Sequence, residues 1–198
     1  MTTDPISPEA GIKLPKISSD IITVSHDHPD HNGTKQIIEA IVRPQPFIID
    51  GPGEYEVSGV SITGIPSFHD SVSGKKYGRN TIFVIIMDGM RMVHLGDIGQ
   101  ELTDQQVEEI NGVDILFIPV GGTFTLDSKQ AAGIANQVEP RIIIPMHYKL
   151  PGTPPELKVV DDFISEMAIE EIEKADKLNI NREKLPEEKK VVVLNARG

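Results

Sequence analysis

Residues 21–31, with the sequence IITVSHDHPDH, decide the fold. The first four residues are β-branched, which is typical of a short buried strand, and this strand runs directly into a polar loop. Side chains two residues apart in an extended chain face the same way, so His26 and His28 can bind one ion. The proline that follows turns the chain and sends Asp30 and His31 to the other side. One loop can therefore seat two metal ions.

The residue types of this loop indicate divalent metal ions. Three imidazoles and a carboxylate at the end of a buried strand have no packing role, because their desolvation would be uncompensated. The chain has no cysteine, which excludes disulfides, thiolate nucleophiles and thiolate metal ligands. Imidazole and carboxylate ligands suit several divalent ions, and we expect zinc, with manganese or iron as alternatives.

Length and composition favour one domain spanning residues 1–198. Hydrophobic residues make up 38% of the chain and charged residues 25%, which excludes collagen, coiled coil and wholesale disorder. The formal net charge of −11 disfavours binding to nucleic-acid phosphates or anionic membranes. No stretch approaches the roughly 18 apolar residues of a membrane span, and the N-terminus lacks a signal-peptide pattern. We therefore expect a cytoplasmic protein that acts on a small molecule and has no nucleic-acid or membrane partner.

Apolar periodicity predicts an α/β architecture in which short buried strands alternate with helices. Strands are expected at residues 21–24, 47–50, 80–88, 90–95, 114–120, 141–146 and 191–194, with a hairpin over 55–65. Helices are expected at residues 34–42, 128–138 and 161–178, with a further short helix after residue 103. Capping boxes at residues 103–106 and 127–130 mark two of the helix starts.

The loop pattern His-x-His-x-Asp-His resembles the signature of the metallo-β-lactamase superfamily. Later motifs agree with that family in their order: His69 in PSFHD, Asp97 in HLGD and His147 in PMHY. Asp4 in TDP resembles the short aspartate motif that precedes the histidine loop in the family. The segments GGTFTLD and IPMHY are similar to those of its small UlaG-like, or uncharacterised zinc-dependent hydrolase, branch.

This resemblance implies a four-layer αββα sandwich with the site at the edge where the strand ends converge. It implies one metal bound by His26, His28 and His69, and a second bound by Asp30, His31 and His147. Asp97 would bridge the two ions. Family members usually begin with a strand hairpin before the aspartate motif, and this chain starts without it, so we expect an exposed sheet edge that invites either association between copies or instability.

The expected activity is hydrolysis of an ester, lactone, amide or phosphodiester bond by hydroxide bound to a dinuclear metal site. Asp30 is the candidate catalytic residue, because it would orient the hydroxide as well as bind metal. One alternative is a non-catalytic, metal-stabilised sensor or ligand-binding protein. A di-iron redox protein is the other, although the relatives of that type carry glutamate where this chain has His28.

Several further residues have both a functional and a structural interpretation. Asp4 is expected to accept a proton from a ligand imidazole behind the site. Strand alternation places His94 on the opposite face from Asp97, either as a partner behind the ligands or as a satisfied core histidine. Asp127 is expected as a helix N-cap rather than a catalytic acid. Substrate contacts remain open; the candidates, each also explained as loop or packing residues, are Lys75, Lys76, Arg79, Phe124 and Tyr148.

Overall fold

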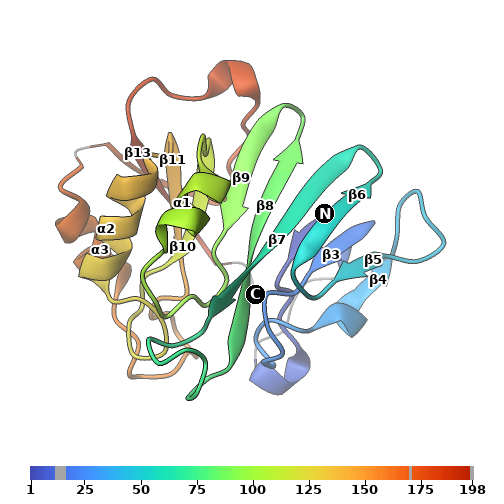
Figure 1. Ribbon diagram of the computed structural model, residues 1–198, viewed down its shortest axis with the longest axis horizontal. Coiled ribbons are helices and arrows are strands. Elements are labelled where there is room, and N and C mark those ends of the chain that lie inside the picture. The colour runs from blue at the N-terminus through green and yellow to red at the C-terminus, as the bar shows by residue number, and fades with distance from the viewer. Residues whose placement is uncertain (12–16, 170, 197–198) are drawn as a thin grey trace.

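The computed structural model describes residues 1–11, 17–169 and 171–196, and an eight-stranded sheet runs through its centre (Figure 1). The strand order is β12-β13-β11-β10-β9-β8-β7-β6. The strands are β6 (Gly53–Val57), β7 (Val60–Phe68), β8 (Arg79–Met87), β9 (Met90–His94), β10 (Ile115–Pro119), β11 (Ile142–Met146), β12 (Ile172–Ala175) and β13 (Lys190–Leu194). Strands β6 to β9 pair antiparallel, and the sheet continues from β9 to β12 with parallel pairs.

A smaller parallel sheet of β1 (Thr2–Thr3), β3 (Ile21–Thr23) and β5 (Phe47–Ile49) packs on half of this sheet. Ile21 of β3 packs toward the large sheet, in one cluster with Phe83 of β8. Ile22 faces the other way and packs with Val24 and Ile37. Because both faces of β3 are buried, its sequence is an uninterrupted β-branched run.

Three helices, α1 (Asp104–Ile110), α2 (Ser128–Val138) and α3 (Val160–Met167), cover the opposite face of the large sheet (Figure 1). Both predicted capping boxes are formed, one at Thr103 with Gln106 and the other at Asp127 with Gln130. The remaining part of the inner face of the sheet is covered by Leu178, Ile180 and Leu185 of the segment before β13. No helix in the described part of the chain is long and apolar enough to cross a membrane.

The helix predicted at residues 34–42 is wrong. Residues Thr34–Gln36 form only a 3₁₀ turn, η2, and Ile37–Glu39 form strand β4, which pairs with β2 (Ile17–Ser18). Isoleucines with helical spacing suggested the helix, but Ile37 is buried and Ile41 is 73% exposed, so the two do not share a buried face. β-Branched residues favour extended backbone, and here a parallel partner is available.

The helix predicted at residues 161–178 is too long. Helix α3 ends at Met167, where Ala168 adopts a left-handed conformation with φ 49°, and the chain then forms edge strand β12 beside β13. Two acidic residues of this segment form ion pairs with Lys190 of β13, which lies 3.3 Å from Glu171 and 2.6 Å from Glu173. The strand partner of residues 172–175 is not part of the helical pattern.

Candidate metal centre

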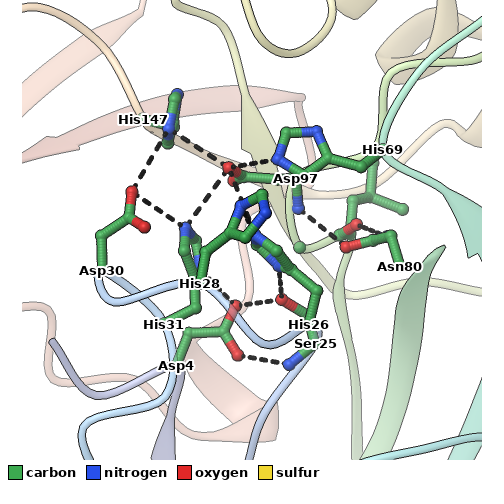
Figure 2. A network of polar contacts seen from close by, with 12 residues as sticks. Asp4, Ser25, His26, His28, Asp30, His31, His69, Asn80, Asp97 and His147 are labelled. Carbon is green, nitrogen blue, oxygen red and sulfur yellow. Dashed lines mark hydrogen bonds and ion pairs between the residues drawn. The ribbon is translucent and has the colours of Figure 1, made fainter. Parts of the chain in front are cut away.

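The candidate ligands follow the ends of four strands that point to one edge of the two sheets. Strand β3 leads into the histidine loop, β7 ends one residue before His69, β9 leads to Asp97, and β11 ends one residue before His147. All seven predicted ligands meet there (Figure 2), namely His26, His28, Asp30, His31, His69, Asp97 and His147. Segments up to 121 residues apart in sequence thus contribute to one site because their strands run in the same direction.

One group of ligand atoms comes from His26, His28 and His69, which lie within 4.8 Å of one another. Nε2 of His26 is 3.0 Å from Nδ1 of His28. The ring centroids of His26 and His69 are 4.7 Å apart. Three imidazole nitrogens this close together could bind one divalent ion.

A second group combines Asp30, His31, Asp97 and His147, again with ligand atoms within 4.8 Å of one another. Nε2 of His147 lies 3.9 Å from Oδ2 of Asp30, and Nε2 of His31 lies 3.6 Å from the same oxygen. Two imidazoles and two carboxylates form a donor set that suits zinc, manganese or iron. These two groups are the sets that the resemblance implied.

Asp97 lies between the two groups. Its Oδ2 is 3.3 Å from Nε2 of His31 and 3.2 Å from Nε2 of His147 in the second group. The same oxygen is 3.4 Å from Nε2 of His69 in the first. Asp97 is only 2% exposed, and its Oδ1 has no hydrogen-bond partner among the described residues. A buried carboxylate oxygen without a partner, facing imidazole nitrogens, fits a bridging position between two cations.

The electrostatics of the site favour cation binding. Burial, helped by the neighbouring His31, lowers the pKa of His26 to about 3, so its imidazole is neutral, which is the metal-binding form. The hydrogen bond with His31 lowers the pKa of Asp30 to about 2. Burial opposes ionisation of Asp97, but His31 and His147 outweigh it and hold the pKa of Asp97 well below its usual value.

His31 carries the proton that balances these carboxylates. Burial alone would lower its pKa, but Asp97, Asp30 and Asp4 outweigh burial and raise the pKa well above its usual value. The carboxylates around His31 thus favour positive charge at this position. Binding of a divalent ion at Nε2 of His31 would release this proton.

Asp4 fixes the orientation of two ligands from behind. Its Oδ1 accepts the backbone N–H of Ser25 at 2.7 Å, and its Oδ2 accepts from Nδ1 of His31 at 2.8 Å and from the Ser25 hydroxyl (Figure 2). Oγ of Ser25 in turn lies 3.0 Å from Nδ1 of His26. With Nδ1 engaged, both histidines present Nε2 to the site.

His94 lies behind Asp4 and belongs to none of the groups that converge in the described part of the chain. Its Nδ1 accepts the backbone N–H of Gly96 at 3.2 Å and is 3.9 Å from Oδ2 of Asp4. Its ring packs near Phe117, with 5.8 Å between the ring centroids. Of the two interpretations of His94, the structure favours a buried histidine that packs behind the ligands.

Asn80 is a residue that the sequence interpretation missed. Its Oδ1 accepts the backbone N–H of Asp97 at 3.0 Å, while its Nδ2 donates to Oγ of Ser67 and to the carbonyl of Leu95 (Figure 2). Gly96 has φ 59°, and a Cβ there would collide with Asn80. The one available signal was an amide at the start of the most apolar strand in the chain.

The structure also separates the remaining candidates. Tyr148 is buried in the main core, and its hydroxyl donates to the carbonyl of Leu194 at 3.3 Å, so it packs rather than lining the site. Asp127 accepts the backbone N–H of Gln130 at 2.8 Å as the N-cap of α2. Phe124 and the loop that contains Lys76 lie beside the site and are considered below.

Replacing Asp127 by alanine should therefore affect stability alone. Loss of the N-cap costs about 1 kcal/mol, which corresponds to a fall in Tm of roughly 3 °C for a chain of this size. Thermal unfolding and elemental analysis of Asp127→Ala check this expectation. Unchanged Tm with lost hydrolysis would instead identify Asp127 as a catalytic acid.

Replacing Asp4 by asparagine should weaken metal binding without unfolding the protein. The amide cannot accept all three hydrogen bonds of the carboxylate, so His31 loses its fixed orientation. Partners of this kind affect metal affinity by about 10–100-fold. Competition with a chromogenic chelator measures the change, and an affinity within twofold of the unsubstituted protein would contradict it.

Comparison with known proteins identifies the family of the chain. A family model described as a β-lactamase superfamily domain matches residues 1–147. A UPF0173 metal-dependent hydrolase of Thermococcus onnurineus is 31% identical over 162 residues, which cover 72% of either chain. Another of Carboxydothermus hydrogenoformans is 32% identical over 165 residues, with the same coverage.

Among solved structures, a protein of Thermotoga maritima described as a Zn-dependent hydrolase of the metallo-β-lactamase superfamily is 36% identical to this chain. The TM-score is 0.78, and the match covers 98% of this chain and 87% of that one. The predicted metallo-β-lactamase type of α/β fold is thereby confirmed. The chain belongs to the metallo-β-lactamase superfamily, in the family of the UPF0173 metal-dependent hydrolases.

Proposed function

We propose that this protein is a hydrolase with a dinuclear metal site, in which zinc is the resident ion. The observation that carries the proposal is the position of Asp97, whose buried carboxylate faces nitrogens of both ligand groups. A structural site for a single ion would need only four ligands, whereas seven side chains converge here.

When bound, two divalent ions would lower the pKa of a shared water, so that hydroxide is available at neutral pH, and would polarise the oxygen of the bond under attack. The exposure of the two carboxylate side chains, Asp97 and Asp30, indicates different roles for them. The side chain of Asp97 is 3% exposed and holds the centre together, whereas that of Asp30 is 46% exposed and faces solvent. Asp30 is therefore placed to orient the attacking water and to accept its proton.

The proposed bond is an ester, lactone, amide or phosphodiester. No nucleophilic side chain is required for any of these, which agrees with a site made only of imidazoles and carboxylates. A di-iron redox function is disfavoured by His28, since an imidazole occupies the position at which redox relatives carry glutamate. A non-catalytic ligand-binding role is the remaining alternative, and the exposed Asp30 is the feature that favours turnover over it.

Removal of the metal tests the proposal. Chromogenic esters, lactones and phosphodiesters should be hydrolysed by protein loaded with zinc, manganese or iron, and dialysis against a chelator should reduce each rate to background. Restoring the ion should restore the rate. Hydrolysis that survives removal of all metal would contradict the mechanism, and tight metal binding without turnover of any of these bonds would favour the ligand-binding alternative.

A further inference from the structure

The rim of the metal centre contains an aromatic pair that no ligand role explains. The ring of Tyr77 lies 5.3 Å from the ring of His69, and the ring of Phe124 lies 6.0 Å from that of Tyr77 in an edge-on contact. Both aromatic residues are half-buried, so each keeps part of its surface exposed beside the ligands. Aromatic side chains that remain partly exposed next to a polar centre are typical of ligand-binding sites.

The loop that carries Tyr77 is held in place by Asp70, the residue after His69. The carboxylate of Asp70 accepts four backbone N–H groups, at 2.8–2.9 Å, from Val72, Gly74, Lys76 and Tyr77. A carboxylate with four such bonds fixes the path of the loop around it. The position of Tyr77 against His69 is therefore built into the fold.

The loop that carries Phe124 follows β10, a strand that supplies no ligand. Strand β10 lies between β9 and β11 and runs parallel to both, so residues 121–126 emerge between Asp97 and His147. Thr123, which is β-branched, is held at φ 60°, and its hydroxyl donates to the carbonyl of Glu156 at 3.0 Å. Positive φ is costly for a β-branched residue, so contacts such as this one must hold the loop in place.

Lys76 adds a positive charge to this rim. Its Nζ lies 4.5 Å from the centroid of the Tyr77 ring, within cation–π distance, and the side chain is exposed. With two divalent ions bound, the three carboxylates of Asp4, Asp30 and Asp97 would be neutralised, so the occupied centre would not repel an anion. In a chain of net charge −11, a rim that combines a cation with aromatic rings indicates selectivity for anions.

We propose that Tyr77, Phe124 and Lys76 form the substrate-recognition wall of the site, for an organic oxyanion whose scissile bond adjoins a planar apolar group. This inference rests on the proposed hydrolase function and names its substrate class. The planar group packs against the two rings, and the ammonium group of Lys76 pairs with the charge of a phosphoryl or carboxyl group.

Binding of non-hydrolysable probes tests this wall without relying on turnover. Calorimetry on the zinc-loaded full chain compares phenylphosphonate with methylphosphonate, which lacks the ring, and with benzoate, which replaces the phosphoryl by a carboxyl group. Both ring-bearing anions should bind, and phenylphosphonate should bind about 10-fold tighter than methylphosphonate. The ratio between phenylphosphonate and benzoate distinguishes phosphoryl from carboxyl recognition.

Substitutions then test which residues produce the preference for phenylphosphonate over methylphosphonate. Tyr77→Ala should reduce the preference for the phenyl probe to about twofold or less, whereas Tyr77→Phe should keep it. Phe124→Leu removes the second ring from a separate loop and should also reduce it. Lys76→Met keeps the side-chain stem and should weaken both phosphonates by roughly 3–10-fold, while Lys75→Met, a matched loss of charge on the same loop, should change them by less than twofold.

Metal content separates failure of this inference from failure of the proposed function. If zinc is bound but phenylphosphonate has no advantage over methylphosphonate, or both ring substitutions leave that advantage unchanged, the recognition wall is wrong and the hydrolase site stands. If the unsubstituted chain takes up no metal and binds neither phosphonate, the proposed function is overturned, and this inference with it.

Discussion

The Asp97→Asn variant is expected to lose hydrolysis by roughly 10³-fold or more, because bridging carboxylates cannot be replaced by a neutral amide that offers one acceptor atom. Oδ2 of Asp97 lies 3.2–3.4 Å from nitrogens of three different histidines. A neutral amide at this position would leave the charge of the metal ions bound by those histidines uncompensated. Steady-state rates on the best chromogenic substrate, together with metal content per chain, measure the loss.

Asp114→Asn is the matched control for that variant. Asp114 precedes β10 at the opposite edge of the sheet, where its Oδ2 accepts the backbone N–H of Arg91 at 2.8 Å. The same change of carboxylate to amide should leave metal content and hydrolysis unaltered there. An Asp97→Asn protein that keeps the rate and metal content of the unsubstituted chain would show that Asp97 is not a ligand.

The Asp30→Ala variant is expected to separate catalysis from metal binding. Hydrolysis should fall by about 10²–10⁴-fold, as is typical when a residue that transfers a proton is removed. The first ligand group, His26, His28 and His69, remains intact, so at least one ion should stay bound. Rates and elemental analysis on the same preparation check both expectations.

Asp27→Asn provides the control within the same loop. Asp27 is exposed, and its carboxylate accepts a hydrogen bond from Asn32 rather than facing the ligands. The hydrolysis rate of the Asp27→Asn variant should equal that of the unsubstituted chain. A rate for Asp30→Ala within tenfold of that control would remove Asp30 from the catalytic role and leave it as a ligand alone.

The candidate ligands could be named from sequence because the histidine loop has a recognisable pattern and resembles a known family signature, whose later motifs His69, Asp97 and His147 match in order. The structure adds that these three residues follow strands that run toward one edge of the sheet. The capping boxes at Thr103 and Asp127 were predictable for a similar reason, since their partners lie three residues away.

The errors arise where a distant partner decides the local structure. Isoleucines at residues 37–41 fit a helix by spacing, but β4 forms because β2 pairs with it across 20 residues of sequence. Helix α3 is shorter than its amphipathic pattern because β13 offers residues 172–175 a parallel partner. Periodicity alone does not contain these pairings.

Asp4 was predicted behind the site, but Asn80 and Tyr77 were missed because distant contacts give them their positions. Asn80 matters because it accepts from Asp97, 17 residues further along the chain, and its amide has no sequence motif of its own. Tyr77 lies in a polar loop whose path depends on four backbone groups that bond to Asp70. Local sequence identifies candidate ligands better than residues whose positions depend on distant contacts.

Metal content per chain is the measurement that tests the central claim most directly. Elemental analysis of protein purified without chelator and incubated with zinc, manganese or iron should give about two equivalents for the unsubstituted chain. His28→Ala and His147→Ala, which each remove one histidine from a different ligand group, should each retain about one. No metal in the unsubstituted chain, or the same content in all three proteins, would contradict a dinuclear centre built from these residues.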